Sequence, residues 1–117
     1  MRMSCKKCKW TTKDIDEDRL VDTHHVLPRY MGGTDIDGRI DLCKGHHKDI
    51  HNKILDSLCN QSEPQYRNKA RTMLSLKDDH KTRRVVESIL FNAIHPERKE
   101  ASRKRTRELT EEWLKDI

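Results

Sequence analysis

Two short segments in the first half of the chain have the pattern of β-strands. Residues 19–27 are rich in β-branched and aliphatic side chains, and residues 39–43 alternate between polar and apolar positions. Pro28 ends the first segment, and the Asp37-Gly38 pair just before the second is a turn signal. These features predict a β-hairpin whose two strands are joined by a flexible, glycine-containing loop.

After these strands, apolar residues recur at helical spacing. We expect one helix from about Lys44, a second that begins at Ser62, a third that is capped by Asp78 or Asp79, and a fourth over residues 97–117. The positions expected to be buried are Ile50, Ile54, Leu55 and Leu58, then Tyr66, Ala70, Met73 and Leu74, then Val85, Val86, Ile89, Leu90, Ala93 and Ile94, and finally Ala101, Leu109, Trp113 and Ile117.

The composition limits the core that such a chain can build. Apolar residues make up 32% of the 117 positions and charged residues 38%. A small domain with so little apolar material often gains stability from a bound metal or from an oligomer contact. We therefore expect an α+β fold, with a small metal-stapled module over residues 1–59 and a mostly helical extension over residues 60–117.

Positive charge is concentrated in the second half of the chain. Of the formal net charge of +5, residues 1–59 contribute +1 (11 basic, 10 acidic) and residues 60–117 contribute +4 (14 basic, 10 acidic). One run holds six basic residues against the single acid Glu100: Arg98, Lys99, Arg103, Lys104, Arg105 and Arg107. This run suits a polyanion such as DNA, and it suits a solvated helix face equally well.

The cysteines predict a structural metal site. The N-terminus has no apolar run typical of a signal peptide, and no segment reaches the roughly 20 apolar residues of a membrane span. We therefore expect a cytoplasmic protein without a membrane contact, in which paired cysteines more often hold a metal than form a disulfide. Cys5-x-x-Cys8 and Cys43-x-x-His46 share one spacing and together predict a closed structural Zn²⁺ site. Cys59 has no close partner and is expected to be a small buried residue.

Four further histidines predict a second, open metal site. His47 and His51 are four residues apart and share one face of the expected helix, whereas His46 points about 100° away. His24, on the preceding strand, is the candidate third ligand. His25 would then lie unbound beside the ion, where a neutral imidazole can act as a general base. Because adjacent residues of a regular strand face opposite sides, both can serve one site only if the strand ends there.

The ordered set of motifs resembles the HNH endonuclease family, the ββα-metal nucleases. The resemblance covers residues 5 to about 55, and it is carried by Cys5-x-x-Cys8, His24-His25-Val26-x-Pro28, Gly32-Gly33 and Leu42-Cys43-x-x-His46-His47-x-x-x-His51. It implies that His25 is the general base and that His24, His47 and His51 hold one divalent ion, which could be Mg²⁺, Mn²⁺, Ni²⁺ or Zn²⁺. It also implies hydrolysis of DNA phosphodiester bonds to give 5′-phosphate ends.

Two positions depart from the family pattern. His46 stands where the family usually has a fourth cysteine, and zinc accepts a Cys₃His set readily. The family's central asparagine has no visible counterpart, and Asp37 or Asp41 is the candidate to brace the loop in its place. Arg29 and Arg39 lie near the expected site and are candidates to clamp a phosphate, with ordinary solvated charge as the alternative.

Three functions are compatible with these patterns, in the following order. The first is a metal-dependent endonuclease that cuts DNA, most simply duplex DNA. The second is a zinc-stapled nucleic-acid-binding module without catalytic activity. The third is a protein with one structural metal and no nucleic-acid role. Residues 60–117 match no motif, and we expect them either to hold duplex DNA or to form a helical packing module or a homodimer contact.

Overall fold

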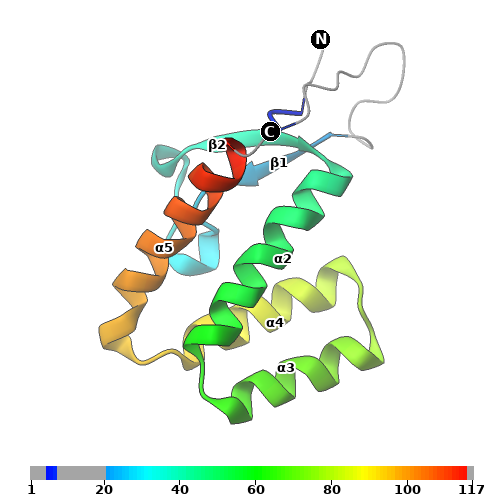
Figure 1. The fold of residues 1–117 in the computed structure, drawn as a ribbon, viewed down its shortest axis with the longest axis vertical. Helices are drawn as coiled ribbons and strands as arrows, with labels where there is room; N and C mark the ends of the chain where they lie inside the picture. Colours follow the sequence, from blue (N-terminus) through cyan, green and yellow to red (C-terminus); the bar gives the residue numbers. More distant parts are fainter. Residues whose placement is uncertain (1–4, 8–20, 116–117) are drawn as a thin grey trace.

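The computed structural model describes residues 5–7 and 21–115 of the chain (Figure 1). Within these residues the fold is a two-stranded antiparallel sheet with four α-helices, which confirms the α+β class. The elements in order are β1 (Val21–His25), the 3-10 turns η1 (Arg29–Met31) and η2 (Asp35–Asp37), β2 (Arg39–Cys43), α2 (Lys44–Gln61), α3 (Pro64–Leu76), α4 (His80–Ala93) and α5 (Pro96–Lys115).

The hairpin and α2 form one continuous unit. β1 pairs with β2 so that His24 lies opposite Ile40 and His25 lies opposite Arg39. β2 ends at Cys43, and α2 begins at the next residue. Figure 1 shows α2 leaving the end of β2 directly. The first turns of this helix are therefore held in a fixed position beside β1.

The loop between the strands is more ordered than the glycines alone suggest. The Thr34 hydroxyl accepts a hydrogen bond from the Ile36 amide, and the Asp37 carboxylate accepts one from the Thr34 amide at 2.9 Å. These two bonds form a capping box around η2. Asp37, one of the two residues expected to brace this loop, therefore holds the turn that follows Thr34.

Two adjacent glycines allow the loop to fold back on Leu27 and Pro28, just after β1. Gly32 has a φ of 84°, in the left-handed region that favours glycine. A Cβ on Gly33 would lie 1.6 Å from the Leu27 carbonyl oxygen, where no side chain can fit. The Gly33 amide donates a hydrogen bond to the Pro28 carbonyl at 3.1 Å. The close return of the chain at this point therefore requires glycine.

A single cluster of buried hydrophobic residues holds the helices against the hairpin. It contains Cys5, Leu27, Met31, Leu42, Ile50, Ile54, Leu55, Leu58, Ala70, Val86, Leu90, Phe91, Ile94 and Trp113. Its members come from both residues 1–59 and residues 60–117, with α2 in contact with the sheet, α4 and α5. The proposed division into two parts stays a prediction, but within the described residues the two parts share their core.

The buried face of α5 includes the predicted Trp113, and Leu109 packs partly against the core, but the rest of this face is not the one that the apolar residues predicted, and Ile117 lies outside the described residues. The buried positions of α5 are Ser102, Thr106, Thr110 and Trp113, whereas Ala101 is exposed. The Thr106 and Thr110 hydroxyls donate to the carbonyl groups one turn earlier, at 2.8 and 3.1 Å. Hydroxyl groups satisfied within their own helix can be buried at little cost, so this polar stripe can pack.

The structure also decides three other expectations, which concern two helix caps and one buried position. Asp79 caps α4, because its carboxylate accepts a hydrogen bond from the Thr82 amide at 2.7 Å. Ser62 closes α2 instead of opening α3, and its hydroxyl donates to the Leu58 carbonyl. Val85 was expected to be buried, but it is 48% exposed because the buried face of α4 runs through Val86 and Leu90.

We predict opposite effects from alanine at two glycines. Gly33→Ala should lower the free energy of unfolding by about 1–3 kcal/mol, because the new methyl group meets the backbone of Leu27. Gly45→Ala should raise it by up to about 0.5–1 kcal/mol, because Gly45 is helical and, apart from its chain neighbours and the helix's own nearby backbone, no described atom lies within 4 Å of a Cβ there. Urea unfolding of both variants tests this, and a Gly33→Ala protein as stable as the wild type would contradict the close return.

Candidate metal centres

Three histidines from β1 and α2 meet beside the sheet. His24 is only 2% exposed and faces α2, where His47 and His51 lie one helical turn apart. The His24 ring centroid is 5.4 Å from that of His47 and 4.9 Å from that of His51, and the latter two are 4.7 Å apart. The structure therefore brings together the three residues that the sequence suggested as ligands of one ion.

The ring nitrogens of these histidines fit a divalent ion. His47 Nε2 and His51 Nε2 are 3.1 Å apart, and His24 Nε2 is buried without a hydrogen-bond partner. One ligand atom from each ring lies within 4.8 Å of the others. Metal–nitrogen bonds of roughly 2.1 Å in a tetrahedral arrangement place neighbouring ligand atoms about 3.4 Å apart. A shared cation would use the buried nitrogen of His24 and separate the two facing nitrogens of His47 and His51.

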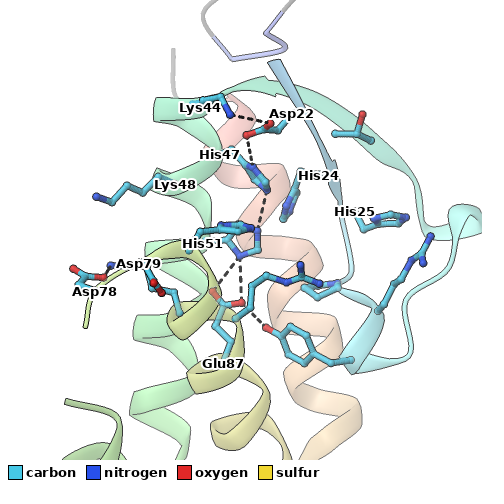
Figure 2. A pocket seen from close by; sticks show the side chains of 17 residues that line it. Asp22, His24, His25, Lys44, His47, Lys48, His51, Asp78, Asp79 and Glu87 are labelled. Carbon is cyan, nitrogen blue, oxygen red and sulfur yellow. Dashed lines mark hydrogen bonds and ion pairs between the residues drawn. The ribbon is translucent and has the colours of Figure 1, made fainter. Parts of the chain in front are cut away.

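Two carboxylates orient the helical histidines (Figure 2). Asp22 Oδ2 lies 3.1 Å from His47 Nδ1, and Glu87 Oε1 lies 3.1 Å from His51 Nδ1. With Nδ1–H donating to a carboxylate, each ring presents the lone pair of its Nε2 toward the other ring. This arrangement is common around protein metal ions, because it fixes the ring and makes the ligand more basic.

Burial favours the neutral form of two of these rings, His24 and His47. Removal from water lowers the pKa of His24 to about 3, with further lowering by His51, His47 and His25. Burial also lowers the pKa of His47, although the hydrogen bond that His47 donates to Asp22 opposes the effect. A neutral imidazole is the form that binds a metal, so protons do not compete with an ion for His24 near neutral pH.

His25 lies apart from the three converging histidines. It is the last residue of β1, and Figure 2 shows its ring on the other side of the strand from His24. His25 Nε2 is 3.2 Å from Asp35 Oδ1 on η2, and Arg39 Nε lies 3.8 Å from the same oxygen. His25 nevertheless lines the same hollow as the three converging histidines. His24 and His25 thus face opposite sides of the strand, as the alternation of a strand requires, yet both line one hollow at the end of β1.

This hollow has a volume of about 1000 Å³ and lies between the hairpin and α4. Its lining comes from the end of β1, η1, the first turns of α2 and the N-terminal half of α4. Three of the exposed cations that line it, Arg29, Lys48 and Arg84, form no ion pair within the described part of the chain, whereas Lys44 pairs with Asp22. His80, the first residue of α4, also lines it, with its ring 6.1 Å from that of His47.

The closed site is supported at three of its four expected ligands. Cys5 Sγ and Cys43 Sγ each lie 3.3 Å from His46 Nδ1, close to the roughly 3.5 Å expected between sulfur and nitrogen ligands of one zinc ion. Cys8, the expected fourth ligand, lies outside the described residues. The Trp113 ring packs edge-on against His46 at 5.9 Å. These residues can hold a metal, and zinc there stays a prediction.

Part of the basic run in α5 makes contacts within the protein. Arg103 Nε donates to the Met31 carbonyl at 2.6 Å, and Arg107 lies 3.6 Å from Asp37. Both arginines therefore tie α5 to the loop between the strands. The other members are Arg98, which donates to the Gln61 carbonyl, Lys99, whose ammonium lies over the Phe91 ring, Arg105, which pairs with Glu112, and the exposed Lys104. A role of this run in binding DNA is not tested by these contacts.

Comparison with known proteins does not identify a family for this chain. The chain matches no protein-family model, no curated protein and no solved structure. Among residues 5–7 and 21–115, no helix combines the length and apolar character that a membrane crossing requires. The chemistry of the site is therefore inferred from its own residues.

We predict two separable metal ions per chain, one for each group. Cys43→Ser should lose the ion of the closed site, and His47→Ala should lose the ion of the open site and retain the other. Cys59→Ser is the matched control, because Cys59 belongs to neither group, and it should retain both. Elemental analysis of purified protein measures the stoichiometry. Full metal content in Cys43→Ser would contradict the closed site.

Proposed function

We propose that this protein is a metal-dependent endonuclease of the HNH type that hydrolyses phosphodiester bonds in DNA. The observation that carries the proposal is the convergence of His24, His47 and His51 on one point of a hollow that His25 also lines. Ligands for one cation and a separate histidine that is free of it are the two components that this chemistry requires.

The three histidines would hold the divalent ion at the floor of the hollow. An ion bound there would neutralise charge on the scissile phosphate and stabilise the leaving 3′ oxygen. Two observations on His24 support this role. Its ring is buried and neutral, and its Nε2 has no hydrogen-bond partner among the described residues. Asp22 and Glu87 keep the Nε2 atoms of the other two rings directed at the same point.

His25 would act on the attacking water. If its Nε2–H donates to Asp35, the lone pair is at Nδ1, which can accept a proton from water. The Asp35 carboxylate would then stabilise the imidazolium that forms, as the acidic member of a catalytic triad does. The capping box at Asp37 and its contact with Arg107 hold the turn that carries Asp35.

The cations around the hollow suit the flanking phosphates. Arg29 comes from η1, Lys48 from α2 and Arg84 from α4, so they approach the hollow from different elements. Each is exposed and without an ion pair in the described residues, which leaves it available to a phosphate. Binding by such contacts should weaken steeply as salt concentration rises. Arg39 supports this role less, because it faces Asp35.

The decisive test is cleavage of plasmid DNA with Mg²⁺, Mn²⁺, Ni²⁺ or Zn²⁺. His25→Ala should lower the rate by roughly 10²–10⁴-fold, because a positioned proton acceptor is lost, and metal content and circular dichroism should not change. His95→Ala is the matched control, since His95 is 63% exposed and distant in sequence from both sites. DNA binding without cleavage in any of these metals would favour the zinc-stapled binding module instead.

A second variant tests the partner of the base. Asp35→Asn should slow cleavage at least about tenfold and leave metal affinity and DNA affinity near the wild-type values, because Asp35 contacts the base and not the three ligands. Asp56→Asn, an exposed carboxylate on α2, is the control for loss of one negative charge. Equal rates for Asp35→Asn and wild type would show that His25 works without this carboxylate.

A further inference from the structure

A carboxylate from the helical extension reaches the candidate metal site. Glu87 is on α4, 36 positions after His51, yet its two oxygens lie 3.1 and 3.2 Å from His51 Nδ1. Its Oε2 also accepts a hydrogen bond from the Tyr30 hydroxyl at 2.9 Å. Figure 2 shows the Glu87 carboxylate beside the His51 ring. Glu87 therefore joins α4, α2 and η1 at a single point.

The position of Glu87 is costly unless a positive charge is near. The residue is 1% exposed, and no lysine or arginine of the described chain forms an ion pair with it. A buried carboxylate without a compensating charge is strongly unfavourable. Asp22 differs in both respects, because its side chain is 31% exposed and Lys44 lies 3.6 Å away. Arg84 is close enough to lower the pKa of Tyr30 but forms no ion pair with Glu87, whereas a cation held where the three histidines converge would lie directly across the His51 ring from the carboxylate.

We propose that Glu87 is a positioning residue of the metal centre, which holds His51 with Nε2 toward the ion and supplies the negative charge that a buried cation requires. This rests on the ion-binding part of the proposed function and not on cleavage. It makes α4 part of the site, so the metal centre would be incomplete in residues 1–59 alone. The carboxylate acts through His51 and does not touch the ion.

Tyr30 supports this arrangement as a fixed donor. Burial raises the pKa of its hydroxyl well above the usual value, and the proximity of Glu87 raises it further. The hydroxyl therefore stays protonated and can only donate to the carboxylate in this pair. The Tyr30 ring packs against Phe91, one turn along α4, with ring centroids 6.0 Å apart. One Glu87 oxygen is thus held by η1, and the carboxylate remains oriented toward His51.

The test is the affinity for Ni²⁺ or Mn²⁺, measured by calorimetric titration of protein whose closed site is already filled with zinc. Glu87→Gln keeps the shape of the side chain and removes its charge, and it should weaken binding by about 10–100-fold. Tyr30→Phe removes the other hydrogen bond to Glu87 and keeps the charge, so its affinity should fall by much less. Circular dichroism and thermal unfolding check the fold of each variant.

A double-mutant cycle separates positioning from general destabilisation. In a His51→Ala background, Glu87→Gln should weaken binding by less than it does in the wild type, because the ring that it orients is absent and only its charge still acts on the ion. The same fold-loss with and without His51 would overturn the proposal, and so would wild-type affinity in Glu87→Gln. Glu87→Asp, which keeps the charge on a shorter side chain, should fall between the wild type and Glu87→Gln.

The two proposals fail in different ways. No DNA enters the titration, so a protein that binds the ion with the expected coupling but cuts no plasmid would retain the role of Glu87 and overturn the nuclease. A protein that cuts plasmid at the wild-type rate with wild-type affinity in Glu87→Gln would retain the nuclease and overturn the role of Glu87.

Discussion

The direct junction between β2 and α2 is the constraint on which the site depends. Cys43 ends the strand and Lys44 begins the helix, so no loop lets the two move independently. β1 is paired with β2, and the position of His24 relative to the first turns of α2 follows from that register. A chain with few apolar residues can therefore bring three imidazoles together with local geometry and a small core.

The helices that follow hold this unit from two sides. At one end, Trp113 of α5 donates to Asp49 at 2.7 Å and packs against His46. At the other, Glu87 of α4 reaches His51 and Tyr30. Both are polar contacts to α2 made by side chains that are almost fully buried. Satisfied polar contacts of this kind select one packing arrangement, because alternatives would leave buried groups without partners.

Local features of the site could be predicted from the sequence, since local geometry determines them. The spacing of His47 and His51 places them on one face of any helix, and Arg39–Cys43 was predicted as a strand with the bounds that it has. Asp22 could also have been suggested, because it is two residues from His24 on the same strand face. Long-range contacts could not be predicted in this way, because the approach of Glu87 to His51 depends on how α4 packs against α2.

The buried face of α5 is a second feature that the sequence pattern predicted only in part. Hydrophobic periodicity correctly selected Trp113, but it also selected the exposed Ala101 and missed the buried Ser102, Thr106 and Thr110. Ser102 donates to the Gln61 side chain, and the Thr106 hydroxyl oxygen lies 3.6 Å from the Met31 sulfur. These contacts depend on tertiary neighbours, so a scale that ranks serine and threonine as polar cannot detect them.

This packing also changes the meaning of the basic run. With its Ser/Thr face turned inward, α5 directs Arg103 and Arg107 to the loop between the strands, where they bind a carbonyl and a carboxylate of the protein. The unpaired cations beside the candidate site come instead from η1, α2 and α4. A phosphate at this site would therefore meet isolated cations from three elements, and the density of charge along α5 says little about where that phosphate would lie.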